Sequence, residues 1–578
     1  MTDTNAEPGD RLIRVDMTTQ TARFEPYPKA WKLLGGRALS AKILLAECDP
    51  KCDALGPANV LVMAPGVMSG TAAPTSGRIS IGGKSPLTGG IKEANAGGNP
   101  GQDLMKLGVR AVVVKGQPKD PGKRYGLEVT ADAVRIVSAD EHKGQWNYAL
   151  CASLGKKYAT ASFITIGPAG ELRLTGASVA CTDGDSRHPA RHAARGGLGA
   201  VMGSKGLKFV SVDAGKRPAR RPADMKSFMD YCKTFTKGYL DGPLMFKTGT
   251  SSFVPIANML NTFPSRNRTS GQSEHVASLD GARIVESFAT RGGGMHNCMT
   301  GCIVKCSNVV NDAQGNYKTS GLEFETLTLL GANCGIASWD DVADLDRLCD
   351  EIGLDTIETG AAIAVYMDSG GMKFGDAEGA KRILREIAEG TELGKAIGNG
   401  ALSIGRKRKH HRIPVVKGQA IPAWDPRPLN ATGVTYATSA MGADHTAGLI
   451  INPGLTADQF ARASQEAQLV NAVCDSSGFC QFLQPTVAEM SKFYSLLVGE
   501  EISREQVADM GWQCLLDEWA FNDRAGFTKA DDDLPACMKE EGVGPNGAMK
   551  FNVSADVIAQ AKVKMPYREE TFAIKAAG

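Results

Sequence analysis

The sequence of 578 residues contains no run of about 18 uninterrupted apolar residues, so no segment is expected to cross a membrane as a helix. It also lacks an excess of charge of either sign. The 65 basic and 63 acidic residues leave a formal charge of +2, which gives no reason to expect nucleic acid or an anionic membrane as a partner. One basic run, 406–412, is short and is interpreted as a solvated loop.

Several other signals are missing. The start of the chain, MTDTNAEPGDRL, has no apolar core segment typical of a secretory signal, so a cytoplasmic location is expected. Thiols stay reduced there, and clustered cysteines then indicate metal binding or catalysis rather than disulfides. Neither GGRALSA nor GGLGAVMG fits a dinucleotide-binding pattern, and there is no internal repeat or low-complexity linker. The length predicts two to four domains of ordinary globular composition.

What the chain does contain is a cysteine cluster, HNCMTGCIVKCSN, which supplies Cys298, Cys302 and Cys306. A remote cysteine, Cys480, stands in CDSSGFCQF. Three local thiolates plus one distant thiolate is a pattern typical of an iron–sulfur cluster. Zinc sites more often take their cysteines in two close pairs, which disfavours zinc here. Structural zinc and unrelated buried cysteines remain the two alternatives.

Glycine is abundant, with 67 residues, and three glycine-rich segments fall within one stretch, 66–101. Glycine permits positive φ and lets backbone approach a ligand closely. Short β-like runs separate these segments. This pattern indicates either a frame for a large cofactor or a turn-rich β domain without a ligand.

The pattern of apolar residues divides the chain into three parts. Residues 1–211 are β-rich, with seven strand-like runs: RLIRVDM, VLVMAP, RISIGG, AVVVKG, YGLEVTA, FITIGPAG and LKFVSVDA. Residues 212–415 carry helical patterns such as WDDVADLDRLCDEIG, in which Asp340 and Asp341 suit the first turn. Residues 416–578 are again mostly helical. The fold class is therefore α+β, with an N-terminal β-rich domain followed by two mostly α-helical domains.

Longer motifs carry a resemblance to a known family. They include GPANVLVMAPGVMSGTAAPTSGR, KSPLTGGIKEANAGGNPG, ARGGLGAVMGSKGLKFV, GLEFETLTLLGANCGI, IGLDTIETG and WDPRPLNATGVTYATSAMGADH. In this order and spacing, the chain resembles the aldehyde:ferredoxin oxidoreductase family of tungsten–pterin enzymes. The resemblance implies a β-rich base covered by two helical domains, with the cofactor at the domain junction. It also implies a tungsten bis-pyranopterin, a [4Fe–4S] cluster and Mg²⁺; molybdenum would fit the same sulfur ligands.

The resemblance assigns residues to these groups. Asp355 in DTIETG and Asp475 in DSSGFC match the motifs that each hold one pterin, and a carboxylate can accept hydrogen bonds from pterin N–H groups. The remaining expected cofactor-binding residues are Arg78, Asn95, Arg195, Gly196, Gly360, Asp444 and Gly478. The cluster ligands are Cys298, Cys302, Cys306 and Cys480, although the family commonly has two residues rather than three between the first two cysteines.

Catalytic residues are expected beside the metal. His445 matches the family's histidine motif, and GLEFET offers Glu325 and Glu323 for its glutamate. Glu325 is favoured because it precedes the threonine of the ET pair, with Glu323 kept as the alternative. A carboxylate in a dry pocket could take a proton from water, and an imidazole could polarise a carbonyl.

The resemblance implies oxidation of an aldehyde with water to a carboxylic acid. Electrons would leave one at a time through the cluster to a ferredoxin or ferredoxin-like subunit, with any flavin or NAD on a separate subunit. An oligomer or multi-subunit complex is expected. The alternatives are another reductase of this family acting on an aromatic thioester and, from a different class, a zinc-stabilised binding or scaffold protein.

Overall fold

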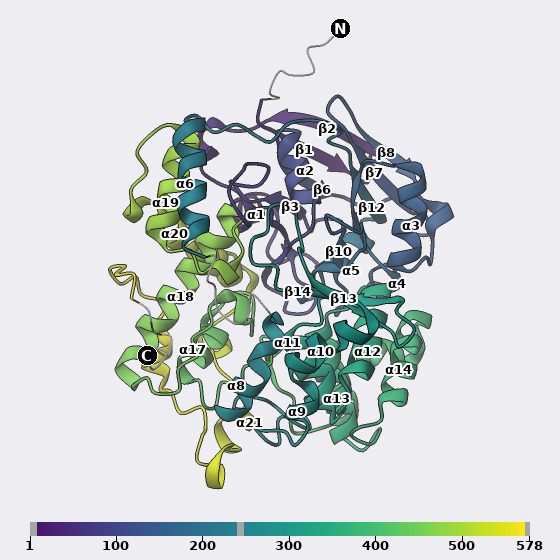
Figure 1. Cartoon of the computed structure of the whole chain (residues 1–578), viewed down its shortest axis with the longest axis vertical. Helices are drawn as coiled ribbons and strands as arrows, with labels where there is room; N and C mark the ends of the chain where they lie inside the picture. The colour runs from purple at the N-terminus through teal and green to yellow at the C-terminus, as the bar shows by residue number, and fades with distance from the viewer. Residues whose placement is uncertain (1–8, 240–247, 571, 573–578) are drawn as a thin grey trace.

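The computed structural model describes residues 9–239, 248–570 and 572. Figure 1 shows strands from the first third of the chain in the upper part, helices from the middle below them, and helices from the last third at the left. The expectation drawn from the start of the chain, MTDTNAEPGDRL, rests partly on residues 1–8, which lie outside the described residues. Residues 223–240, ADMKSFMDYCKTFTKGYL, also have a helical pattern, and their last residue, Leu240, lies outside them too. Within the described ranges, no helix is both long and apolar enough to cross a membrane.

Two six-stranded sheets form the N-terminal part. The first has the order β2-β1-β6-β3-β4-β5, and the second has the order β11-β10-β9-β12-β7-β8. The strands of the first sheet are β1 (Arg11–Asp16), β2 (Thr21–Pro26), β3 (Leu61–Pro65), β4 (Ile79–Lys84), β5 (Ile91–Ala96) and β6 (Val109–Lys115). Those of the second are β7 (Tyr125–Val129), β8 (Val134–Ser138), β9 (Ser162–Thr165), β10 (Val179–Cys181), β11 (Arg191–Ala193) and β12 (Leu207–Val212).

One apolar core joins the two sheets. Buried side chains such as Met63 and Val112 of the first sheet pack with Ile164 and Val210 of the second. Each of the seven expected runs contains a strand, although the second half of FITIGPAG leads into α4. The sequence signal missed five others, among them β5. Its Lys-Glu-Ala-Asn content disfavours a strand, but pairing with β4 holds it in place.

Five helices lie within this β-rich part: α1 (Gly36–Glu47), α2 (Pro100–Lys106), α3 (Asn147–Lys157), α4 (Pro168–Glu171) and α5 (Leu198–Ser204). Helices dominate after β12. They are α6 (Met225–Lys237), α8 (Phe253–Met259), α9 (Val276–Leu279), α10 (Gly281–Arg291), α11 (Phe324–Thr326), α12 (Trp339–Ile352), α13 (Thr356–Asp368), α14 (Ala377–Glu389), α15 (Glu392–Gly398), α16 (Ala401–Arg408), α17 (Asn430–Thr438), α18 (Ala457–Ser477), α19 (Val487–Val498), α20 (Arg504–Ala525), α21 (Ala536–Glu540) and α22 (Ala555–Gln560). The α+β fold class is confirmed.

Local chemistry explains where these helices begin and end. The Ser338 side chain accepts the N–H of Asp341 at the start of α12, and Asp340 and Asp341 occupy its first turn, as expected. Gly353 ends α12 in the left-handed conformation. A π-helical turn, Leu327–Gly331, follows α11 directly.

Two small sheets interrupt the helical part. The first consists of β13 (Gly293–His296), β14 (Ser307–Asn311) and β15 (Tyr317–Ser320), and the second of β16 (Val415–Val416) and β17 (Gln419–Ala420). His296 of β13 pairs with Ser307 of β14. This antiparallel ladder closes the loop 297–306, which carries three of the four cysteines expected to bind the cluster.

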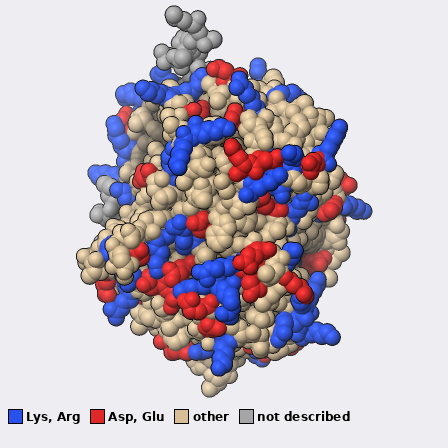
Figure 2. Space-filling model, turned by 90° about the vertical axis from the view of Figure 1, so that its right-hand side faces the viewer, with Lys and Arg blue, Asp and Glu red and all other residues tan. Residues whose placement is uncertain are grey.

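Charged groups of both signs are interspersed on the face shown in Figure 2. The expectation that 406–412 forms a solvated loop is wrong in part. Residues 406–408 end α16, and Arg412 pairs with Asp368 at 2.6 Å and with Glu541 at 2.7 Å. Neighbouring carboxylates therefore neutralise part of this basic run.

Candidate functional site

The structure brings the four predicted cluster cysteines together. Cys298, Cys302 and Cys306 lie on the loop between β13 and β14, and Cys480 lies just after α18. Each thiol interacts electrostatically with the other three, and Cys298 and Cys302 share a hydrogen bond. Burial raises the pKa of Cys306 well above its usual range, and the neighbouring Glu323 and Cys480 add to this rise.

Thr75 joins the two cysteine segments through its backbone and hydroxyl. Its N–H donates to Gly301 O at 2.9 Å, and its Oγ1 accepts the N–H of Ile303 at 2.9 Å. Its carbonyl accepts the N–H of Cys480 at 3.0 Å. Thr75 has a φ of 54°, which is uncommon for a β-branched residue and is maintained by these bonds. Sequence reasoning missed this residue; its only signal was its place in TAAPTSGR.

Arg78 lies between the cysteines and Asp475. Its Nη2 donates to Asn95 O at 3.2 Å, and its Nε donates to Asn95 Oδ1. Burial opposes the charge of Arg78, but Cys480, Cys298 and Asp475 raise its pKa. A Cβ on Gly97 would lie 3.1 Å from Cys298 Sγ and 3.8 Å from an Arg78 nitrogen, so glycine permits a close approach there.

Asp475 occupies the last turn of α18 and interacts electrostatically with Arg78. Its Oδ1 accepts from Gln481 Nε2 at 3.2 Å, and its Oδ2 lies 3.5 Å from Arg37 Nη1. Burial raises the pKa of Asp475 to about 6, although Arg37 and Arg78 oppose the rise. Gly478 caps α18 with a φ of 91°, and its carbonyl accepts the N–H of Arg78 at 3.2 Å.

Arg195 connects the three parts of the chain. Its Nε donates to Asp355 Oδ2 at 3.2 Å, and its Nη1 and Nη2 donate to the carbonyls of Ala443 and Ala420 at 2.7 and 2.6 Å. Asp355 caps α13 by accepting the N–H of Ile357, and its side chain, which binds Arg195, is only 1% exposed.

Asp444 and Gly196 lie at the same junction. Lys92 donates to Asp444 Oδ2 at 2.5 Å. Burial would raise the pKa of Asp444, but Lys92 and Arg195 hold it well below its usual range. Gly196 has a φ of +80°, and a Cβ there would lie 2.4 Å from Lys92 Cγ. The third expected glycine, Gly360, lies in α13 against Leu329, where a Cβ would lie 2.6 Å from its carbonyl. Helix packing accounts for Gly360, and its contact with a cofactor stays a prediction.

Glu325 and His445 face one another. Glu325 Oε2 accepts the N–H of Ala423 at 2.7 Å, which fixes the carboxylate. Its Oε1 lies 3.8 Å from His445 Nδ1. In the described part of the chain, these two buried atoms have no hydrogen-bond partner. Buried polar atoms are normally paired, so this pair is suited to bind a small polar molecule.

Glu323 lies apart from this pair, on the cysteine side. Its Oε2 accepts from the hydroxyl of Thr250. Burial raises the pKa of Glu323, against the effect of Arg191, and its charge in turn raises the pKa of Cys306. The backbone explains the separation: Glu323 is extended and precedes α11, whereas Glu325 is within this helix. The geometry therefore associates Glu325, not Glu323, with His445.

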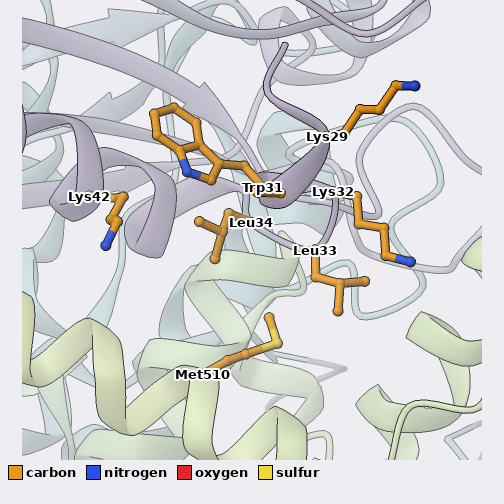
Figure 3. A pocket seen from close by; sticks show the side chains of 8 residues that line it. Lys29, Trp31, Lys32, Leu33, Leu34, Lys42 and Met510 are labelled. Atoms are coloured by element: carbon orange, nitrogen blue, oxygen red, sulfur yellow. The ribbon is translucent and has the colours of Figure 1, made fainter.

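A surface pocket of about 500 Å³ lies elsewhere, lined by residues 29–34, Lys42 and Met510 (Figure 3). Lys32 in this pocket pairs with Glu500 at 2.6 Å. None of the predicted site residues lines the pocket. The convergence of buried charged side chains at the domain junction is better evidence for a functional site than this surface pocket, whose lining is mostly apolar with three lysines.

The fold and the site define a multidomain protein with four clustered thiols and a separate carboxylate–imidazole pair. Two domains of one known protein family match most of the chain. The aldehyde ferredoxin oxidoreductase N-terminal domain matches residues 12–214, and domains 2 and 3 of that family match residues 231–570. The chain belongs to the aldehyde ferredoxin oxidoreductase family, and it is an oxidoreductase of that family.

Individual relatives extend along nearly the whole chain. The tungsten-containing aldehyde ferredoxin oxidoreductases of Thermococcus kodakarensis and Pyrococcus furiosus are 31% and 30% identical, over 93% of this chain and 92% of theirs. The WOR-like subunit of an aliphatic sulfonate oxidoreductase of Pyrococcus furiosus is 26% identical, over 97% of this chain and 93% of the subunit.

Among solved structures, the active site complex BamBC of benzoyl coenzyme A reductase, in complex with 1,5 dienoyl-CoA, has the same fold. It has a TM-score of 0.79 and 18% identity, over 95% of this chain and 92% of that chain.

Proposed function

We propose that this chain oxidises an aldehyde with water to a carboxylic acid and passes two electrons, one at a time, through a [4Fe–4S] cluster to a ferredoxin or ferredoxin-like subunit. The partly buried Glu325–His445 pair carries the proposal, because these two side chains present buried polar atoms that have no hydrogen-bond partner in the described structure. The names of the tungsten-containing relatives support the same reaction.

The four thiols fit a cluster better than a single zinc ion. All four interact with one another and come from two segments that Thr75 holds together. Three cysteines from one loop and one from a distant segment are the ligand pattern typical of an iron–sulfur cluster, whereas zinc sites more often take their cysteines in two close pairs.

The remaining expected cofactor-binding residues suit a bis-pyranopterin. Arg78, Asn95, Asp475 and Gly478 would bind on the cysteine side. Arg195, Gly196, Asp355, Asp444 and Gly360 would bind on the other side, with Mg²⁺ near the carbonyls of Asn95 and Gly196. Buried carboxylates and guanidinium groups suit the N–H groups and phosphates of such a cofactor. When bound, tungsten would supply the oxo chemistry and the two-electron redox chemistry.

The protein's own part in the reaction is to orient the substrate and move protons. Glu325 Oε1 would accept a proton from the attacking water, and Ala423 N–H would keep the carboxylate directed toward it. His445 would donate a hydrogen bond to the aldehyde oxygen and polarise the carbonyl. In balance, aldehyde and water give a carboxylic acid, two protons and two electrons.

The aromatic-thioester alternative uses the same fold with a different substrate. The benzoyl coenzyme A reductase likeness shows only that this fold can serve such a reaction. An assay separates the alternatives: protein purified without oxygen should reduce a viologen dye with simple aldehydes. Activity with an aryl coenzyme A thioester and none with any aldehyde would favour the alternative.

The route by which electrons would leave the chain indicates what kind of partner subunit it needs. A nicotinamide takes up a hydride, which requires a two-electron donor such as a flavin. The chain alone should therefore reduce viologen but not NAD, and NAD reduction should appear only with an added flavin-bearing subunit. Rapid NAD reduction by the isolated chain would contradict this path. A multi-subunit assembly and a cytoplasmic location stay predictions.

A further inference from the structure

Arg191 is a buried arginine that has no part in the mechanism above. It lies in β11, at one edge of the second sheet, and pairs with Cys181 of β10. Only 8% of Arg191 is exposed. Its Nη2 donates to Ser320 Oγ at 3.0 Å, and its buried Nε has no acceptor among the described residues. A fully charged guanidinium with an unused buried donor needs a compensating group nearby.

The backbone places the cysteine loop next to this edge of the sheet. Gly98 donates its N–H to Cys298 O at 3.0 Å, and a Cβ on Gly98 would lie 3.2 Å from Cys181 Cβ, beside Arg191. On the same strand connection, Asp183 lies 3.5 Å from His296, two residues before Cys298. Arg191 is therefore close to the first cluster cysteine.

A second segment approaches Arg191 from the other side. Ser320 and Gly321 lead to Glu323, and a Cβ on Gly321 would lie 3.0 Å from Arg191 Nη1. Arg191 lies close enough to Cys298, Asp183 and Glu323 to interact electrostatically with each of them. Arg78 also interacts with Cys298, so this thiol has two cations near it.

We propose that Arg191 is a positioning and tuning residue for the cluster: its charge and its free Nε–H stabilise the reduced cluster beside Cys298. This inference rests on the proposed function, because it requires the four cysteines to hold a [4Fe–4S] cluster. Reduction adds negative charge to the cluster, and nearby charge and hydrogen bonds to sulfur set its potential. Removing Arg191 would also weaken the neutralisation of Asp183 and Glu323, which changes the potential in the same direction.

The test is a redox titration of the cluster, followed by EPR, in wild-type protein and in Arg191→Gln, Arg191→Met and Arg191→Lys. Arg135→Gln is the matched control, because Arg135 is an exposed arginine of β8 at the opposite edge of the same sheet. Iron content and integrated EPR intensity show whether each variant holds its cluster. A wild-type protein without iron or a cluster signal would contradict the proposed function itself, before Arg191 is tested.

Arg191→Gln and Arg191→Met should lower the ratio of reduced to oxidised cluster about tenfold at a fixed applied potential. This change corresponds to a midpoint potential of the cluster about 59 mV lower for one electron. Arg191→Lys should recover much of this change, and Arg135→Gln should match wild type. An unchanged potential in Arg191→Gln with an intact cluster overturns the proposal. If the Gln and Met variants lose iron, retention in Arg191→Lys supports a role for the charge, whereas loss in all three overturns tuning by charge.

Discussion

Replacing Glu325 with glutamine tests the proton-accepting role of this residue. The amide carbonyl can still accept the N–H of Ala423, so the side chain should keep its position. The amide nitrogen, however, cannot take a proton in place of Oε1, the atom that lies 3.8 Å from His445 Nδ1. The loss should therefore appear in catalysis and not in cofactor retention.

A positioned general base contributes about 10²–10⁴ in rate. At about 1.36 kcal/mol per factor of ten, even the lower limit is about 2.7 kcal/mol of transition-state stabilisation. We expect turnover of Glu325→Gln, measured with an aldehyde and a viologen dye, to fall at least about 100-fold, with iron and tungsten per chain unchanged.

Two further variants complete this experiment. Glu323→Gln removes the carboxylate on the cysteine side, which contacts Thr250 and not His445, so its turnover should fall less than about tenfold. Glu286→Gln removes an exposed carboxylate of α10 that pairs with Arg283, and its activity should equal wild type. Turnover of Glu325→Gln within about threefold of wild type, with the metals present, would refute the reasoning. A larger loss in Glu323→Gln would show that the other glutamate is the base.

Three other predictions concern the scaffold. Cys480→Ser should lower both iron and tungsten per chain by metal analysis, because Cys480 follows just after the end of α18, which carries Asp475 of the expected pterin motif; full occupancy of both metals would reject its assignment. Gly66→Ala should lower the melting temperature, at a cost of about 1–3 kcal/mol or more, because its Cβ would lie 2.1 Å from Gly478 Cα. Gly9→Ala, with nothing within 4 Å, should not lower it. Burial raises the pKa of Glu358 from 4.5 to about 7, so the folded state keeps this proton where the unfolded state has lost it. The free energy of unfolding should therefore fall as pH rises through that window, by up to about 3 kcal/mol, and Glu358→Gln should remove this part of the pH profile in denaturant titrations.

Much of the fold was predictable because the apolar patterns are strong. The runs that became β3, β6 and β12 are rich in valine and other β-formers, and α12 combines an N-cap serine with a periodic apolar face. The strand β5 was not predictable from IKEANA, because its stability depends on pairing with β4 and on contacts such as that of Lys92 with Asp444. Its position nevertheless places Asn95 beside Arg78.

The site was predictable only where side-chain chemistry is distinctive. The cysteine spacing singled out four thiols, which interact electrostatically with one another in the structure; their binding of a cluster stays a prediction. The resemblance favoured Glu325 over Glu323, but sequence alone could not show that the two point to different places, because they are neighbours in one motif and only the start of α11 separates them. Thr75 and Arg191 act through contacts with residues more than 120 positions away, which no local pattern reveals.

The most direct test of the account is the metal content of anaerobically purified protein, together with its EPR spectrum after reduction. Four thiols around a cluster predict about four iron atoms per chain, a brown colour and the EPR signal of a reduced [4Fe–4S] cluster. The family cofactor predicts about one tungsten, or molybdenum in its place. About one zinc per chain, with neither iron nor tungsten, would contradict the central claim.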